Sequence, residues 1–145
     1  MTRSISTEIM IAAPAERVWE VLTDFALYPE WNPFIITAEG DPRVGQRLIA
    51  TFRPPGGSTQ TFRPIVLRAE PPLALVWRGS LPIPGLFAGE HSFLLTPEGT
   101  RTRFRNEETF FGLLPPFFGK LLRQSEEGFR LMNAALKDRA ERATA

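Results

Sequence analysis

The sequence predicts an α+β fold in which a curved antiparallel sheet of about seven strands is crossed on its concave face by one long C-terminal helix, with two short helices after the first strand. Three observations support this prediction. Apolar and polar residues alternate over residues 4–12, strand-like stretches separated by turn signals fill residues 34–111, and an apolar stripe of helical period follows. Because the sheet and the helix must each bury an apolar face, we expect them to pack together.

The expected first strand is followed by two short helices. Its alternation places one set of side chains on a single face: Ile5, Thr7, Ile9 and Ile11. Residues 13–25 predict a helix, because Pro14 suits a first helical turn and apolar residues follow at helical spacing, namely Val18, Leu22 and Phe25. Pro29 and Pro33 limit the second helix to about one turn before the chain becomes extended.

Turn signals divide residues 34–111 into the strands of an antiparallel sheet. The sequence "PPGGS" at 54–58 turns the chain, and the prolines at 71 and 72 separate the strand-like stretches "TFRPIVLRAE" and "LALVWRG". The longest connection, "SLPIPGLFAG" at 80–89, is too apolar to lie fully exposed to water. We therefore expect it to cover another part of the molecule.

The C-terminal helix is expected over residues 115–142. Its apolar stripe has spacings of three and four and consists of Leu114, Phe118, Leu122, Ser125, Phe129, Met132 and Leu136. At about 1.5 Å per residue the helix would extend roughly 40 Å, enough to cross the whole sheet. Gly128 weakens the helix locally, since glycine costs about 1 kcal/mol relative to alanine inside a helix.

Composition limits the possible functions. The 145 residues fit a single domain over residues 1–145, and 17 basic against 16 acidic residues give a net charge of +1, which argues against nucleic acid as the partner. The absence of cysteine excludes disulfides and thiolate catalysis. The opening lacks the continuous apolar core of a signal peptide, and no run reaches membrane-spanning length. We expect a cytoplasmic protein without an integral membrane segment.

Five stretches that together cover nearly the full chain point to a known family. They are "IAAPAERVWEVLTDFALYPEWNP" at 11–33, "VGQRL" at 44–48, "EPPLALVWRG" at 70–79, "GEHSFLL" at 89–95 and "ETFFGLL" at 108–114. They resemble the START-like superfamily, also called SRPBCC or helix-grip, and specifically its small bacterial polyketide cyclase/dehydrase and lipid transport members. The first stretch is the most specific, because helix entry at a proline followed by the Tyr-Pro-x-Trp-Asn-Pro cluster is the usual opening of this family.

This resemblance implies a deep cavity between the sheet and the C-terminal helix that takes an apolar, lipid-like or polyketide-like small molecule. It implies neither a metal nor an organic cofactor. This sequence departs from the iron-containing oxygenase relatives, because a facial triad of iron ligands needs two histidines and this chain has one. Under this interpretation residues 80–89 form a cover over the cavity mouth.

The one histidine, His91, lies in an expected hairpin whose faces can be assigned from its arginines. Arg101, Arg103 and Arg105 alternate and must face solvent, which turns Asn106 and Glu108 inward. A turn centred on Glu98 and Gly99 predicts the pairs Leu95 with Thr102, Phe93 with Phe104, and His91 with Asn106, with Glu108 diagonal to His91. Three polar groups would then converge on an otherwise apolar face.

These polar groups allow three interpretations. They hydrogen-bond a ligand, or His91 and Glu108 act as acid and base in a cyclase, dehydratase or isomerase, or the cluster only satisfies its own hydrogen bonds. The candidate ligand-binding residues are Trp77, Phe87, His91, Phe93, Phe104, Asn106, Glu108, Phe110, Phe118, Phe129 and Met132. A further alternative is an interaction module of the chaperone-activator kind, which needs no cavity.

Overall fold

The computed structural model describes residues 3–80, 88–112 and 118–142, without the side chains of Ser80 and Phe118. The elements in chain order are β1 (Arg3–Ile11), α1 (Ala15–Thr23), the 3-10 turn η1 (Phe25–Leu27), α2 (Tyr28–Trp31), β2 (Ile35–Glu39), β3 (Ile49–Phe52), β4 (Gln60–Phe62), β5 (Ile65–Glu70), β6 (Ala74–Ser80), β7 (Ala88–Glu98), β8 (Arg101–Phe111) and α3 (Phe118–Glu141). This order confirms the predicted α+β class, with short helices after the first strand and a long C-terminal helix. None of the helices in the described ranges is long and apolar enough to cross a membrane.

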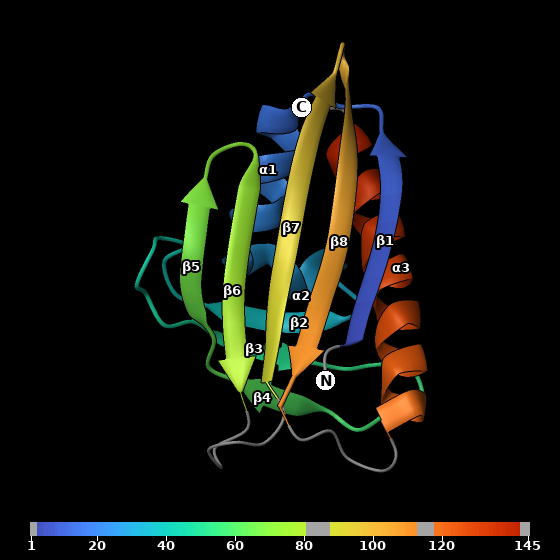
Figure 1. Ribbon diagram of the computed structural model, residues 1–145. Coiled ribbons are helices and arrows are strands. Elements are labelled where there is room, and N and C mark those ends of the chain that lie inside the picture. Colours follow the sequence, from blue (N-terminus) through green and yellow to red (C-terminus); the bar gives the residue numbers. More distant parts are fainter. Residues whose placement is uncertain (1–2, 81–87, 113–117, 143–145) are drawn as a thin grey trace.

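The strands form two hydrogen-bonded ladders (Figure 1). Within the described ranges there are eight strands rather than about seven, in a five-stranded sheet of order β1-β8-β7-β6-β5 and a three-stranded sheet of order β2-β3-β4. Every strand pair is antiparallel, as predicted. The additional strand arises because the predicted stretch "TFRPIVLRAE" is divided at Arg63 and Pro64 into β4 and β5, which belong to different sheets.

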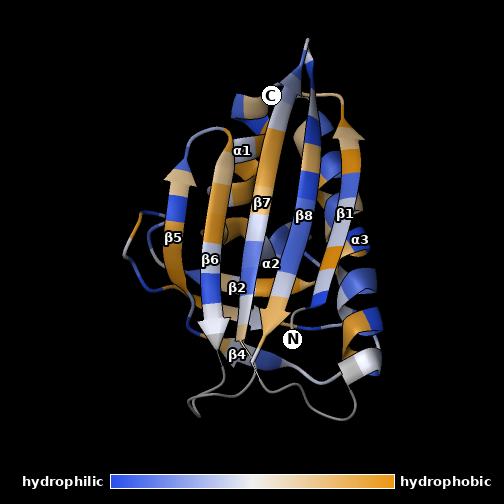
Figure 2. Cartoon of the chain, in the orientation of Figure 1, coloured by the Kyte–Doolittle hydropathy of each residue, from blue (hydrophilic) through white to orange (hydrophobic). Residues whose placement is uncertain are grey.

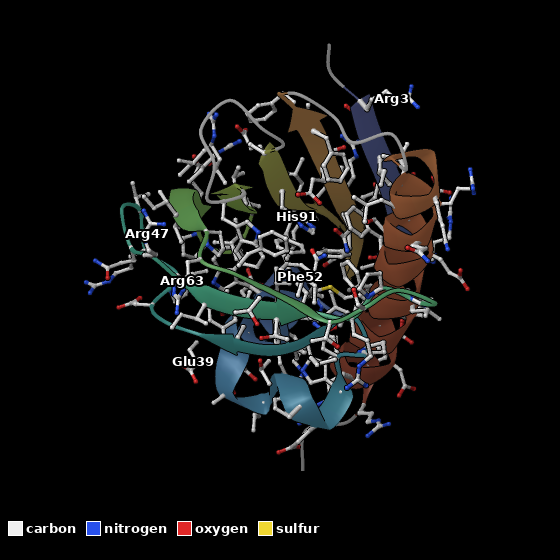
Figure 3. The ribbon with its side chains drawn as sticks, turned by 90° about the horizontal axis from the view of Figure 1, so that it is seen from below. Arg3, Glu39, Arg47, Phe52, Arg63 and His91 are labelled. Carbon is white, nitrogen blue, oxygen red and sulfur yellow. The ribbon has the colours of Figure 1, made fainter. Side chains whose placement is uncertain are left out.

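The two ladders are joined where the chain passes from β4 to β5. The amide of Leu48 donates to the carbonyl of Pro64 at 2.8 Å, and the amide of Val66 donates to the carbonyl of Gln46 at 2.9 Å. Seen from below (Figure 3), the three-stranded sheet faces the inner side of the five-stranded sheet, and α3 closes the side between them. The result is a curved sheet with α3 along its concave side, as expected.

Helix α3 has a two-faced surface, and its hydrophobic and hydrophilic residues alternate along the ribbon in Figure 2. Its buried positions include the predicted stripe members Ser125, Phe129, Met132 and Leu136. They pack against a fully buried core. It includes Ile11 of β1, Leu22 of α1, and Phe93 and Phe104 of the β7–β8 hairpin. The stripe thus holds the helix on the sheet by apolar burial.

Gly128, expected to weaken α3, lies where the helix meets Phe34. A Cβ atom at residue 128 would lie 2.5 Å from Cε1 of Phe34, closer than any real van der Waals contact. The Phe34 ring also packs edge-on against Phe129, with the ring centroids 5.5 Å apart. The glycine therefore gives up helix propensity so that the ring can lie directly against the helix backbone.

We predict that Gly128→Ala lowers the free energy of unfolding by about 1–3 kcal/mol, because overpacking against Phe34 outweighs the gain in helix propensity. Gly119→Ala in the same helix is the matched control, since among the described residues its added Cβ meets nothing nearer than the Arg123 Nη1 atom at 3.7 Å. That variant should be neutral or slightly more stable. Urea unfolding of both variants measures the difference, and an equal gain in both would contradict the close approach of Phe34.

Candidate functional site

The β7–β8 hairpin that carries His91 has a register two residues away from the predicted one. Glu98 pairs with Arg101, so the turn is the two-residue loop of Gly99 and Thr100, in which Gly99 has a φ of +67°. The predicted pairs were therefore wrong. The observed pairs are Leu95 with Phe104, Phe93 with Asn106, and His91 with Glu108.

A shift of two residues leaves every side chain on its expected face, because the side-chain period of a strand is two. His91 and Asn106 are buried, at 1% and 0% exposure, and Glu108 points to the same inner side. The three arginines of β8 lie on the outer face: Arg101, Arg103 and Arg105. The arginine pattern therefore indicated the correct faces although the turn was misplaced.

A chain of buried hydrogen bonds runs from His91 through three elements. Asn106 Nδ2 donates to Asn133 Oδ1 at 3.0 Å, Asn133 Nδ2 donates to Thr7 Oγ1 at 2.9 Å, and the Thr7 hydroxyl donates to the Asn106 carbonyl at 2.9 Å. Each donor is fixed by the next acceptor, so Asn106 Oδ1 is left to accept from His91 Nε2, 2.6 Å away. The imidazole therefore carries its hydrogen on Nε2, and its Nδ1 holds a lone pair.

The lone pair of His91 Nδ1 faces Glu108. Nδ1 has no hydrogen-bond partner among the described residues and lies 3.8 Å from Glu108 Oε1. Burial lowers the pKa of His91 to about 4, although its hydrogen bond with Asn106 opposes the shift. Burial also raises the pKa of Glu108 to about 8. At neutral pH the pair is thus a neutral imidazole beside a protonated carboxyl group.

Aromatic rings enclose His91 on both sides. The Phe93 ring stacks on it with centroids 4.3 Å apart, the Phe129 ring stacks with centroids 4.8 Å apart, and Trp77 approaches edge-on at 5.7 Å. In Figure 3 the label of His91 lies in the interior between the sheets and α3. The imidazole is held in place but does not reach an open space.

An apolar cavity of about 90 Å³ lies beside Glu108. It is bounded by β3, β4, β6, β8 and α3, and its described lining consists of Phe34, Phe52, Pro54, Gln60, Phe62, Pro64, Trp77, Glu108, Phe110, Leu121 and Ser125. Glu108 is the only ionisable residue in that lining. The volume is below the roughly 300–1,000 Å³ of typical small-molecule sites, so a larger ligand requires the walls to separate.

The structure divides the predicted ligand-binding residues into two groups. Trp77, Glu108 and Phe110 line the cavity. The others with described side chains lie in the surrounding core and not in the cavity lining: His91, Phe93, Phe104, Asn106, Phe129 and Met132. Of the expected cover at 80–89, Ser80 ends β6 and Ala88 and Gly89 begin β7, so the connection is shorter than predicted. Residues 81–87, including Phe87, and the Phe118 side chain lie outside the described residues.

Sequence reasoning missed several parts of the site. Phe52 and Phe62 line the cavity from β3 and β4, with ring centroids 5.8 Å apart. The signal was present, because both residues flank the "PPGGS" turn on the inner face of an alternating hairpin. Thr7 and Asn133 complete the hydrogen-bond chain and were not singled out. Thr7 was a polar residue on the apolar face of the first strand, which marks a position that needs a buried partner.

Gly89 gives Glu108 the space it occupies. A Cβ atom on Gly89 would lie 3.1 Å from the Glu108 carboxyl carbon Cδ and closer still to Oε2. Gly79 is the cross-strand neighbour of Gly89 on the same face. Among the described residues, a Cβ on Gly79 would meet only Pro64 and Phe62, at ordinary distances of 3.8 Å and 4.0 Å. The position of the carboxyl group beside His91 therefore depends on Gly89.

No metal site accompanies these groups in the part of the chain that is described, since no three His, Asp or Glu side chains are grouped to hold an ion there. The polar groups at the cavity are instead suited to hydrogen bonding and proton transfer. Glu108 offers a hydrogen-bond donor, and Gln60 and Ser125 add neutral polar groups to the lining.

Comparison with known proteins identifies the family. Residues 2–141 match the family described as "Polyketide cyclase / dehydrase and lipid transport", and the chain belongs to this family. The predicted START-like membership is thereby confirmed. No curated protein sequence matches the chain.

Solved structures share the fold over almost the whole chain. Protein MLL2253 from Mesorhizobium loti is 25% identical with a TM-score of 0.76, covering 99% of this chain and 100% of that one. The Zhui aromatase/cyclase from Streptomyces sp. R1128 is 19% identical with a TM-score of 0.78, over 98% and 95% of the two chains. A START superfamily protein from Mycobacterium smegmatis is 21% identical with a TM-score of 0.77, over 95% and 97%. These similarities confirm the helix-grip fold, which hosts many functions.

We predict that Gly89→Ala displaces the Glu108 carboxyl group at little cost in stability, within about 1 kcal/mol, because the obstructing atoms are the end of a flexible side chain. A displaced carboxyl reaches more water, so its pKa should fall from about 8 toward its ordinary 4.5. An NMR titration of the carboxyl carbon measures this change. Gly79→Ala should leave the titration unaltered, and an unchanged midpoint in both variants would show that Gly89 does not position Glu108.

We also predict that stability falls between pH 6.5 and 8. Glu108 ionises near 4.5 when unfolded and near 8 when folded, so the folded state holds the extra proton and loses stability as the pH rises through this interval. His91, lowered from 6.5 to about 4, acts in the opposite direction, but only below pH 6.5.

The expected loss from pH 6.5 to 8 is about 1–2 kcal/mol, measured by urea unfolding. Residue 108 cannot ionise in the Glu108→Gln variant, so the free energy of unfolding of this variant should not show this fall between pH 6.5 and 8. Parallel curves for the two proteins would mean that the folded-state carboxyl has an ordinary pKa.

Proposed function

We propose that this protein binds an apolar, aromatic or polyketide-like small molecule in the cavity, and that the protonated Glu108 donates a hydrogen bond to a carbonyl oxygen of that ligand. The observation that carries the proposal is a single carboxyl group, with its pKa raised to about 8 by burial, in an otherwise aromatic and aliphatic wall. A neutral carboxyl group can donate where a carboxylate can only accept. The family description supports the apolar ligand class.

The cavity can enlarge for a ligand if the two parts of its wall, the β3–β4 hairpin and α3, move apart. Pro54 and Gln60 come from the β3–β4 hairpin, whereas Leu121 and Ser125 come from α3. The hairpin rests on the helix through its glycines, since a Cβ on Gly57 would lie 3.2 Å from Gln124 Oε1. In the described ranges β4 is an edge strand of the three-stranded sheet, so we expect this side-chain contact to be the part of the wall that separates when a ligand enters.

The interaction-module alternative has less support from the surface. The large hydrophobic residues that are most exposed in the described ranges come from several different elements: Leu27, Val44, Ile49, Leu67, Leu73 and Leu131. Exposed hydrophobic residues are normal on soluble domains, and their presence alone does not define a docking patch. The proposal therefore rests on the cavity and not on an outer face.

A fluorescent aromatic ketone, 6-propionyl-2-(dimethylamino)naphthalene, and the hydrocarbon 2-ethylnaphthalene provide a test of the carbonyl contact. The wild type should bind the ketone more tightly than the hydrocarbon. Glu108→Leu should remove this difference, because the missing hydrogen bond weakens the binding free energy of the ketone by about 1–3 kcal/mol. Glu108→Gln keeps a donor and should keep most of the advantage. Glu107→Gln on the outer face, where Ser6 hydrogen-bonds the carboxylate, is the control. Equal binding of both probes by the wild type would contradict a role for Glu108.

A second candidate function is a cyclase or dehydratase, favoured by the 3.8 Å approach of His91 Nδ1 to Glu108 Oε1. Glu108 would pass its proton to a substrate hydroxyl as the C–O bond breaks and water leaves. The resulting carboxylate would then take a proton from the neighbouring carbon as the C=C bond forms, which restores the carboxyl group. His91 would position Glu108 without touching the substrate, because it is 1% exposed and absent from the described lining.

Mass spectrometry of co-purified molecules separates the two functions. If the protein only binds, wild type and Glu108→Gln should retain the same molecule. If it dehydrates a substrate, the variant should retain a precursor heavier by one water than the molecule in the wild type, since glutamine cannot transfer the proton.

A further inference from the structure

A groove on the outer face of the sheet, separate from the cavity, combines three arginines with an apolar floor. Its described lining consists of Arg47, Thr61, Phe62, Arg63, Ile65, Leu67 and Arg78, and its volume is about 550 Å³. Trp77 and Arg78 are adjacent on β6 and point to opposite faces, so the groove lies across the sheet from the cavity. In Figure 3, Arg47 and Arg63 lie at one side of the molecule, away from His91 and Phe52 in the interior.

None of these three arginines forms an ion pair within residues 3–80, 88–112 and 118–142. Arginines elsewhere on the sheet do so, for example Arg68 with Glu70 at 2.7 Å and Arg103 with Glu98 at 2.7 Å. The rest of the chain, residues 1–2, 81–87, 113–117 and 143–145, contains no Asp or Glu that could pair with them. The groove thus concentrates positive charge without an internal counter-ion.

Two of the three guanidinium groups, those of Arg47 and Arg78, are held by other contacts. Arg47 Nη1 donates to the Arg63 carbonyl at 2.8 Å, which ties the side chain to the β4–β5 connection. Arg78 lies over the Phe111 ring, 4.5 Å from its centroid. Glu90 lies opposite Arg78 in the strand register, and among the described residues it forms no ion pair. Arginines held in this way lose less conformational freedom when they bind an anion.

We propose that this groove binds an amphipathic small molecule through its anionic group, a phosphate or a carboxylate. Guanidinium groups hydrogen-bond both anions in bidentate geometry, and the Thr61 hydroxyl adds a further polar contact. Phe62, Ile65 and Leu67 offer apolar contact to the carbon chain next to the anion. We expect this binding to be independent of an occupant of the cavity, because the described linings of the two sites share only Phe62.

Octyl phosphate, octanoate, 1-octanol and inorganic phosphate are the probes for this proposal, with NMR shifts of backbone amides and arginine Nε–H groups as the measurement. Octyl phosphate or octanoate should shift Thr61, Ile65 and Leu67 and bind roughly tenfold or more tightly than either 1-octanol or inorganic phosphate alone. The tighter of the two anions identifies the head group.

The double variant Arg47→Gln/Arg63→Gln should lose roughly tenfold or more of this affinity, whereas Arg101→Gln, an exposed arginine at the hairpin turn, should lose less than about twofold. Glu108→Leu should leave the groove binding unchanged, which separates this result from the cavity. Three results would overturn the proposal. They are NMR shifts confined to Trp77 and Phe110, equal affinity for octanol and the anions, and an equal loss of affinity in Arg101→Gln. Thermal unfolding of the variants shows whether they remain folded.

Discussion

The hydrogen-bond chain from Thr7 through Asn133 and Asn106 to His91 connects β1, α3, β8 and β7 inside the apolar core. Buried polar groups must be satisfied, so these four elements have one relative placement in which every donor has its acceptor. Removing one member leaves buried partners unpaired at about 1–3 kcal/mol each. The apolar stripe of α3 holds the helix to the sheet, and this chain fixes the position at which it lies.

The same chain determines the chemistry of the site. Because Asn106 accepts from His91 Nε2, the Nδ1 lone pair is directed at Glu108. Burial keeps both groups neutral, with the pKa of His91 lowered to about 4 and that of Glu108 raised to about 8. A neutral imidazole cannot attract an ionised carboxylate, so Glu108 keeps its proton and its capacity to donate. The cavity thus presents a hydrogen-bond donor where an ordinary glutamate would present a charge.

The sequence predicted the elements of this fold well because their signals are local. Alternation in β1 and β8, the stripe of α3 and the prolines after α1 each act within a few residues. The faces of His91, Asn106 and Glu108 followed from three alternating arginines. The register did not, because it depends on which two residues form the turn, and moving that turn by one residue shifts every pair by two. The cavity lining could not be predicted because Phe34, Phe52 and Leu121 meet only through tertiary packing. The cytoplasmic location and the single-domain organisation stay predictions.

Two glycines show most clearly what sequence patterns omit. In the sequence, Gly89 is only a small residue in an expected strand, and Gly128 is only a residue that weakens an expected helix. In the structure each marks the place of a larger side chain from elsewhere: the Glu108 carboxyl group lies over Gly89, and the Phe34 ring lies against Gly128. Both of those side chains line the cavity. The site therefore depends on missing Cβ atoms as much as on the groups present, because a methyl group at either glycine would push the polar or the aromatic part of the wall out of place.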